Sequence, residues 1–302
     1  MKFGNVIIEM DKIATYLTPD YERAIAHCAG SILRLHAGER IVNKIFGRAA
    51  QSHAAGLLLV MASEARLGLG SRPTLGVIQK AIGKPRTIAA FIALLRFSGF
   101  VSVEADPDDR RSPFLVPSER LQAGLSEWLA HHMLAGEIMG LVPSGLAARM
   151  RADPDYRTAM FAASRQVLER SRAAMAGPGA AAWFDAFDCG DRIALVLLDR
   201  HYSEALRTGE AFAFSSRQTA ALIGISHGHV RNVINAAAEA GYLTFVGQRD
   251  RIVLSPRMLR EFGLWHERFW TWVGEAARSA QHLATALPPV PEGGDGGEVV
   301  RP

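Results

Sequence analysis

The stretch TLGVIQKAIGKPRTIAAFIALLRFSGFVSV at 74–103 has a counterpart in SSRQTAALIGISHGHVRNVINAAAEAGYLTFV at 215–246. Gly83 of the first stretch matches Gly224 of the second, and a later glycine of each stretch matches as well. In both copies an amphipathic segment ends at the first glycine, a second amphipathic segment follows, and a glycine–aromatic pair leads into a β-rich segment. The chain therefore contains an internal repeat, and this repeat determines the fold that we expect.

Two short helices joined at a glycine and followed by a β-hairpin are typical of a helix-turn-helix with a β-wing, a unit that reads DNA. The expected helix pairs lie at 73–82 with 85–97 and at 216–223 with 228–240. The expected wing strands lie at 100–104 with 114–116 and at 242–246 with 252–254. Two such units in one chain predict a protein that contacts two parts of one duplex.

The remaining periodicity predicts long helices around these units, so the fold class is mainly α with small β-wings. The long helices are expected at 20–48, 51–67, 118–140, 155–176, 191–207 and 257–284. The domain organisation that follows is an N-terminal arm at 1–19, a first winged unit at 20–140, a linker at 141–154, a second winged unit at 155–286 and a disordered tail at 287–302.

Composition agrees with a soluble two-domain protein. The chain has 302 residues, of which 49% are apolar and 21% charged, and its net charge of +4 is compatible with a nucleic-acid partner. Cys28 and Cys189 belong to no metal or redox motif, which favours buried free thiols in a reducing compartment. The first residues do not resemble a signal peptide, and the apolar runs are too short to span a bilayer. We therefore expect a cytoplasmic protein without a membrane contact, a metal or a cofactor.

The second helix of the second copy has a face suited to base reading. Its apolar side is Val230, Val233, Ile234 and Ala237, and the opposite side holds Gly228, Asn232, Asn235 and Glu239, flanked by His229 and Arg231. Asn pairs with adenine and Arg with guanine in the major groove. Ser226 and His227 lie at the amino end, where backbone N–H groups meet phosphate. These residues are the main DNA-binding candidates, against the alternative of an ordinary solvated surface.

The outward face of the second helix in the first copy has fewer polar side chains. Its buried side is expected to be Ile88, Phe91, Ile92 and Leu95, and its outward side Arg86, Ala90, Ala93 and Phe97. Lys84, Arg86 and Thr87 are candidates for phosphate contacts, whereas the alanines offer methyl groups only. This helix is expected to discriminate sequence less sharply, and an exposed Phe97 indicates a protein contact.

The wings carry arginines at their expected tips. Arg110 and Arg111 lie in the first wing, and Arg249 and Arg251 in the second. Arginine at such a tip enters the narrow minor groove, where the negative potential is focused. Arg217, in the first helix of the second pair, completes the set of DNA-binding candidates. Charged hairpin tips are also common on any soluble protein, so the wings support the prediction only together with the helices.

The chain resembles the MarR family of bacterial winged-helix transcriptional regulators. The resemblance rests on 73–100, on the wing DDRRSPFLVPSERL at 108–121, and on RDRIVLSPRML at 249–259, which lacks the double arginine. It covers most of 20–284 through short motifs, and generic winged-helix proteins share much of it. Family members are about half this length and form homodimers through their terminal helices. The resemblance therefore implies a fused pseudo-dimer with a long-helix body, a small-molecule effector site between body and heads, and further homodimerisation through the long helices.

No enzyme signature is present, so catalysis is not expected. Gly83 and Lys84 resemble part of a phosphate-binding loop, but Pro85 replaces the Ser or Thr that would bind Mg²⁺. His132 and His266 lack the spacing of a zinc site and are interpreted as core or surface residues. The sequence predicts a DNA-binding transcriptional regulator. Its alternatives are a plasmid-type replication initiator, which also carries two winged helices, and an interaction scaffold whose winged helices do not bind DNA.

Overall fold

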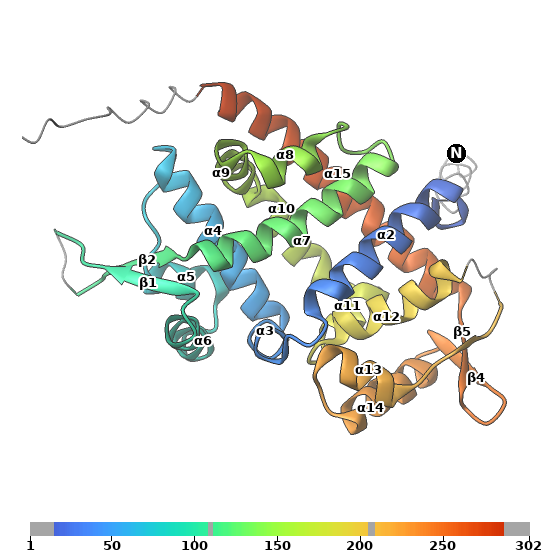
Figure 1. The fold of residues 1–302 in the computed structure, drawn as a ribbon. Helices are drawn as coiled ribbons and strands as arrows, with labels where there is room; N and C mark the ends of the chain where they lie inside the picture. The colour runs from blue at the N-terminus through green and yellow to red at the C-terminus, as the bar shows by residue number, and fades with distance from the viewer. Residues whose placement is uncertain (1–14, 108–110, 205–208, 287–302) are drawn as a thin grey trace, which may run out of the picture.

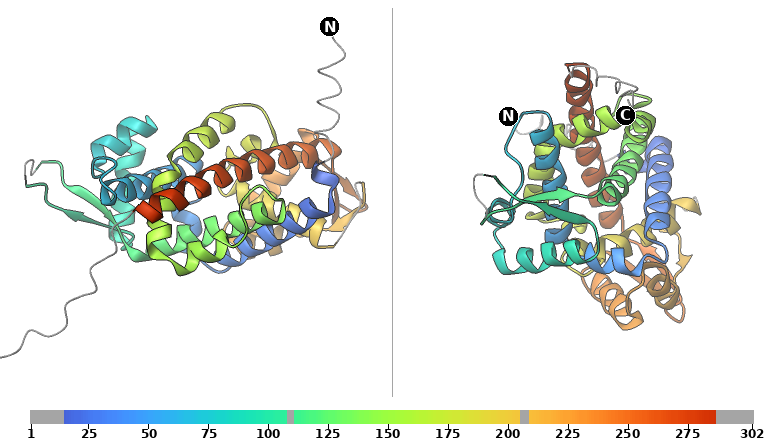
Figure 2. Two further views of the ribbon diagram at one scale, coloured as in Figure 1. Left: turned by 90° about the horizontal axis from the view of Figure 1, so that it is seen from above. Right: turned by 60° about the vertical axis from the view of Figure 1, so that its left-hand side comes forward.

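The computed structural model describes residues 15–107, 111–204 and 209–286, and it is mainly helical with two small antiparallel sheets. Three long helices, α2 (Pro19–His36), α7 (Glu119–Ile138) and α15 (Pro256–Ala286), run side by side and form a helical body, seen from above in Figure 2. Two groups of helices, each with a β-hairpin, lie at the two ends of this body (Figure 1). Within the described ranges no helix is both long and apolar enough to cross a membrane.

The two groups contain the same elements in the same order. The first consists of α4 (Ala49–Arg66), α5 (Leu75–Ile82), α6 (Pro85–Phe97), β1 (Val101–Glu104) and β2 (Phe114–Pro117), and α7 follows it. The second consists of α12 (Gly190–Ser203), β3 (Phe212–Ala213), α13 (Ser216–Ile223), α14 (His227–Glu239), β4 (Leu243–Val246) and β5 (Arg251–Leu254), and α15 follows it. β5 pairs with both β3 and β4, and in the first group a bridge from Thr74 to Phe114 stands where β3 stands in the second.

The repeated glycines have the conformation that the repeat predicts. Gly83 ends α5 with φ 79°, and Gly224 ends α13 with φ 69°, both in the left-handed region where a Cβ is disfavoured. Each first helix also begins at a hydroxyl cap, since Thr74 accepts from the N–H of Val77 and Ser215 from that of Gln218.

The junction between the β-hairpin and the following long helix is repeated as well. Arg120 stacks over the ring of Phe100 at 4.5 Å in the first copy, and Arg257 stacks over Tyr242 at 4.8 Å in the second. Each aromatic residue follows the glycine after the second helix. Each arginine lies two residues beyond the serine that precedes the next long helix. The structure therefore extends the repeat to a cation–π pair that the sequence comparison did not identify.

The hydrophobic core crosses the expected domain boundary. α2 packs on α12 of the second group, while α9 (Pro154–Ala163) packs on α4 of the first. The larger core cluster unites Tyr21, Met133, Tyr156, Leu197 and Trp270, and a smaller one lies under α5, α6 and the β1–β2 hairpin. A helix that precedes each group thus packs on the first helix of the other group, and the larger core cluster contains residues of both expected units, 20–140 and 155–286.

Several expected elements are broken or shifted. The helix predicted at 20–48 ends at His36, because Gly38 has φ 77°, and a separate helix α3 (Arg40–Ile45) follows. The helix predicted at 155–176 is split at Ser164 into α9 and α10 (Arg165–Met175).

Two other segments differ from the prediction because short apolar runs carried too little periodicity. The segment predicted as a linker at 141–154 contains α8 (Leu146–Ala152), with three buried residues, and α11 (Ala180–Asp185) was not predicted.

The helices expected at 85–97 and 216–223 are confirmed as α6 and α13. Most of the arm at 1–19 and all of the tail at 287–302 lie outside the described residues.

A glycine of α15 is expected to be essential for packing, whereas a glycine of α7 is not. A Cβ at Gly274 would lie 2.1 Å from the carbonyl oxygen of Leu141, and nothing lies within 4 Å of a Cβ at Gly124. We expect Gly274→Ala to destabilise the fold by about 1–3 kcal/mol through overpacking. Gly124→Ala should stabilise it by up to about 1 kcal/mol through helix propensity. Urea unfolding of both variants measures these changes. If both substitutions change the free energy of unfolding in the same direction, the close approach of α15 to the turn after α7 is contradicted.

Candidate nucleic-acid interface

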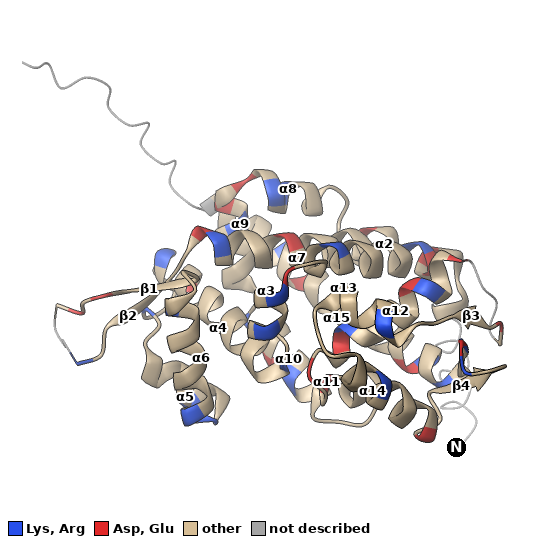
Figure 3. Ribbon diagram, turned by 60° about the horizontal axis from the view of Figure 1, so that its bottom comes forward, with Lys and Arg blue, Asp and Glu red and all other residues tan. Residues whose placement is uncertain are grey.

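The second helices of the two pairs, α6 and α14, lie on the same side of the helical body, with α3 between the two groups (Figure 1). Figure 3 looks onto this side and shows Lys and Arg on α5, α3 and α14. A protein that reads one duplex at two places requires its two reading helices on one side. The arrangement therefore meets the first geometric condition for the predicted interface.

α14 presents the face that the sequence predicted. Val230, Val233, Ile234 and Ala237 are buried, while Arg231 and Asn232 are exposed and Asn235 is half-buried. Within the described residues, the side chains of Arg231 and Asn232 form no hydrogen bond or ion pair. Their polar groups are thus available to base edges. Arg217, on α13, is also exposed.

The amino end of α14 is partly engaged within the protein. Ser226 is the N-cap residue, and its hydroxyl accepts a hydrogen bond from the N–H of His229 at 3.1 Å. Nε2 of His229 donates to the carbonyl oxygen of Asp188 at 2.8 Å. The Asp188 carboxylate in turn binds Arg48 of the first half, and this hydrogen bond holds the pKa of Asp188 below its usual range. His229 therefore serves to position α14, while His227 remains exposed at the helix start.

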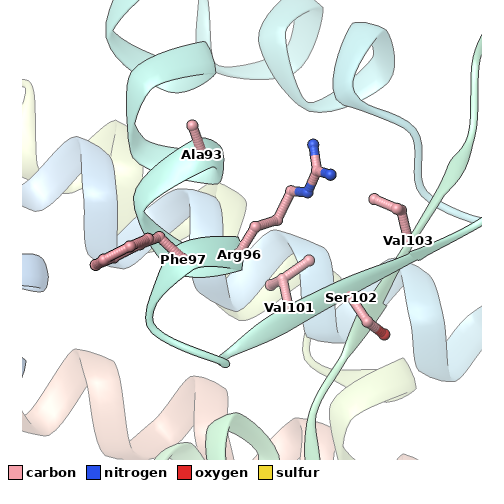
Figure 4. Close-up of a pocket in the computed structure, with 6 residues that line it drawn as sticks. All are labelled: Ala93, Arg96, Phe97, Val101, Ser102 and Val103. Atoms are coloured by element: carbon pink, nitrogen blue, oxygen red, sulfur yellow. The ribbon is translucent and has the colours of Figure 1, made fainter.

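α6 also has the predicted faces. Ile88, Phe91, Ile92 and Leu95 are buried, and Lys84, Arg86, Thr87, Ala90 and Ala93 are exposed. Phe97 is 92% exposed, as expected for a residue on the outward side. A shallow hollow lies between α6 and β1, and Figure 4 shows Arg96 reaching over it while Phe97 points away.

The wing arginines differ in their surroundings. Arg110 lies outside the described residues, and Arg111 is exposed. In the second wing, Arg249 has φ 67° and stacks over Phe245 at 5.1 Å, and Arg251 donates to the carbonyl oxygen of Ala211 beside β3. These two guanidinium groups are held against their own sheet, so a contact with the minor groove of DNA would require them to leave these partners.

Sequence reasoning missed α3, which carries the exposed residues Arg40 and Lys44. The periodicity of 20–48 was interpreted as one helix, which placed these residues on a body helix rather than between the two groups of elements. The glycines at 38 and 47 were the available signal, because each lies next to an end of α3.

Comparison with known proteins gives no relationship: no family model, curated protein or solved structure matches the chain. The function is therefore inferred from the residues of this interface.

Proposed function

We propose that the chain is a tandem winged-helix protein that binds specific double-stranded DNA and regulates transcription, without catalysis. The observation that carries the proposal is that α6 and α14 expose their outward faces on one side of the body, and each is followed by a β-hairpin. Each group has a helix, then a residue or short strand that pairs with the hairpin, then two helices and the two hairpin strands. This order supports assignment to the winged-helix class. The resemblance of 73–121 to MarR-type regulators agrees with this assignment.

The two heads are proposed to act as a fused pseudo-dimer. The reciprocal packing of α2 on α12 and of α9 on α4 supports this, because helix exchange of this kind is what two intertwined subunits would give. A fused pair with unlike helices reads an asymmetric site rather than a palindrome. α14, with Arg231 and Asn232, supplies most of the specificity, and α6 supplies phosphate contacts through Lys84 and Arg86.

A small-molecule effector belongs to the same proposal. A hollow lies between α2, α12 and α13, lined in part by Leu33, Val196, Asp199 and Thr219. Burial raises the pKa of Asp199 above its usual range. This is the region between body and head where the resemblance implies a ligand, and occupancy there would change the position of α13. Further homodimerisation through the long helices stays a prediction.

A scaffold function is favoured by one observation. Phe97 is 92% exposed, and Leu94 and Val77 are exposed on the same helix pair. An apolar surface of this kind is typical of a protein contact. The scaffold alternative applies to the first head, whereas the polar face of α14 supports DNA binding by the second.

Capture of genomic DNA fragments by the purified protein at low and at moderate salt tests the proposal. We expect recovery of a small set of enriched fragments, with affinity that falls steeply as salt rises, because released counterions drive phosphate binding. Enriched fragments that lie at promoters support a regulator, and repeats at an origin support the replication initiator. The absence of salt-sensitive binding would overturn the proposal in favour of the scaffold.

A further inference from the structure

We infer that α3 is a third DNA contact, in which Arg40 and Lys44 bind the phosphate backbone between the two reading heads. This inference rests on the proposed function and adds a binding site to it. The two residues are four positions apart, so they lie on one face of α3. Both are exposed, and Ile41 beside them is 65% exposed.

The position of α3 links the two heads. On one side α3 packs on α6. On the other side Arg40 touches the turn between α13 and α14, where a Cβ at Gly224 would lie 2.9 Å from Cγ of Arg40. A duplex that enters both heads with its major groove presents its backbone and minor groove to the protein between them. α3 is the element that meets this part of the duplex.

α3 is held rigidly in this place. Asn43 is buried and donates to the carbonyl oxygen of His36 at 2.8 Å, which ties α3 to the end of α2. Beyond its other end, the buried Arg192 of α12 donates to the carbonyl oxygen of Phe46 at 2.9 Å. The N–H of Cys189 donates to the carbonyl oxygen of Gly47 at 2.7 Å. Contacts from residues 189 and 192 thus fix the end of α3, so little backbone conformational entropy is lost when DNA binds.

The charges of α3 are available to a phosphate. Among the residues that the structure describes, the side chains of Arg40 and Lys44 form no ion pair or hydrogen bond, whereas Arg48 nearby is paired with Asp188. Arginine and lysine are the usual phosphate ligands at such surfaces. Glu39 precedes α3 and is exposed, so its carboxylate opposes the binding of phosphate. The inference therefore predicts opposite effects for the removal of these two kinds of charge.

The test measures binding of the full chain to a captured DNA fragment as a function of salt. We expect the double variant Arg40→Gln/Lys44→Gln to weaken binding to specific and random DNA by similar factors. It should reduce the magnitude of the negative slope of log K against log salt by about 1.8, or 0.9 for each lost phosphate contact. Glu39→Gln should strengthen binding. The control Arg268→Gln/Arg278→Gln removes two exposed charges from α15 and should leave the slope unchanged.

The outcomes separate this inference from the proposed function. If the unchanged protein binds with a steep salt slope and the α3 variant keeps that slope, the inference is overturned and the proposed function stands. If the control reduces the magnitude of the slope as much as the α3 variant does, the change comes from the net charge of the protein rather than from α3, and the inference is overturned. If the unchanged protein does not bind DNA, both are overturned. Thermal unfolding of each variant checks that the fold is retained, which is expected because the replaced side chains are exposed.

Discussion

The double variant Arg231→Ala/Asn232→Ala is expected to lose sequence-specific DNA binding while it keeps its fold. Both side chains are exposed on α14, opposite the buried residues Val230 and Val233. Each base contact of this kind discriminates by about 1–3 kcal/mol, so the pair corresponds to a loss of roughly 30-fold or more in specific affinity. Binding to random DNA should fall much less, because it depends on phosphate contacts.

Competition between a captured fragment and random DNA measures this discrimination directly. Arg86→Ala in α6 is the matched control, because Arg86 is also an exposed arginine on a second helix. This control should weaken binding to both DNAs similarly and reduce the salt slope by about 1. Unchanged discrimination in the α14 variant would contradict the assignment of base reading to α14.

Acid is expected to destabilise the helical body through two buried histidines. Burial lowers the pKa of both His132 and His266 to about 3. The Trp270 indole N–H donates to Nδ1 of His132, and the Tyr21 hydroxyl lies 2.8 Å from Nδ1 of His266. Because an indole N–H only donates, His132 must be neutral there. The core thus holds the uncharged form of His132, and burial favours the uncharged form of His266.

The direction of the pH effect follows from these lowered pKa values. Below about pH 6.5 the unfolded chain binds protons at both histidines, and the folded chain does not until about pH 3. The free energy of unfolding should therefore decrease as pH falls through this window, by roughly 1.4 kcal/mol per pH unit for each histidine. Asp185, whose pKa burial raises to about 6, contributes the opposite slope between about pH 6 and the ordinary Asp pKa of about 4.

A comparison of variants isolates the histidine contribution. His132→Gln keeps a hydrogen-bonding side chain but does not titrate, so its urea unfolding at pH 6.5 and 5.5 should show a decrease about 1 kcal/mol smaller than that of the unchanged protein, because the unfolded histidine is already half protonated at pH 6.5. His282→Gln, at an exposed position of α15, should leave the decrease unaltered. An identical pH dependence in the His132 variant and the unchanged protein would show that His132 is not held neutral in the fold.

Much of the candidate site was predictable because it depends on local periodicity. The buried and exposed faces of α6 and α14 follow from spacing along a single helix, and both were correct. The engagement of His229 by Asp188 and of Arg251 by Ala211 was not predictable, because each joins residues about 40 positions apart. A sequence pattern identifies that a polar side chain faces outward, but it does not identify a partner that another segment brings to it.

The sequence by itself determined the repeat, the helix pairs with their glycine ends and the buried and exposed faces of α6 and α14. These features are set by backbone preferences and by hydrophobic spacing within about 30 residues. The tertiary structure alone decided that α2 packs on α12 and α9 on α4, and that α3 lies between the heads. The physical reason is that an apolar helix face specifies burial but not its partner, and the partner is selected only when the whole core packs.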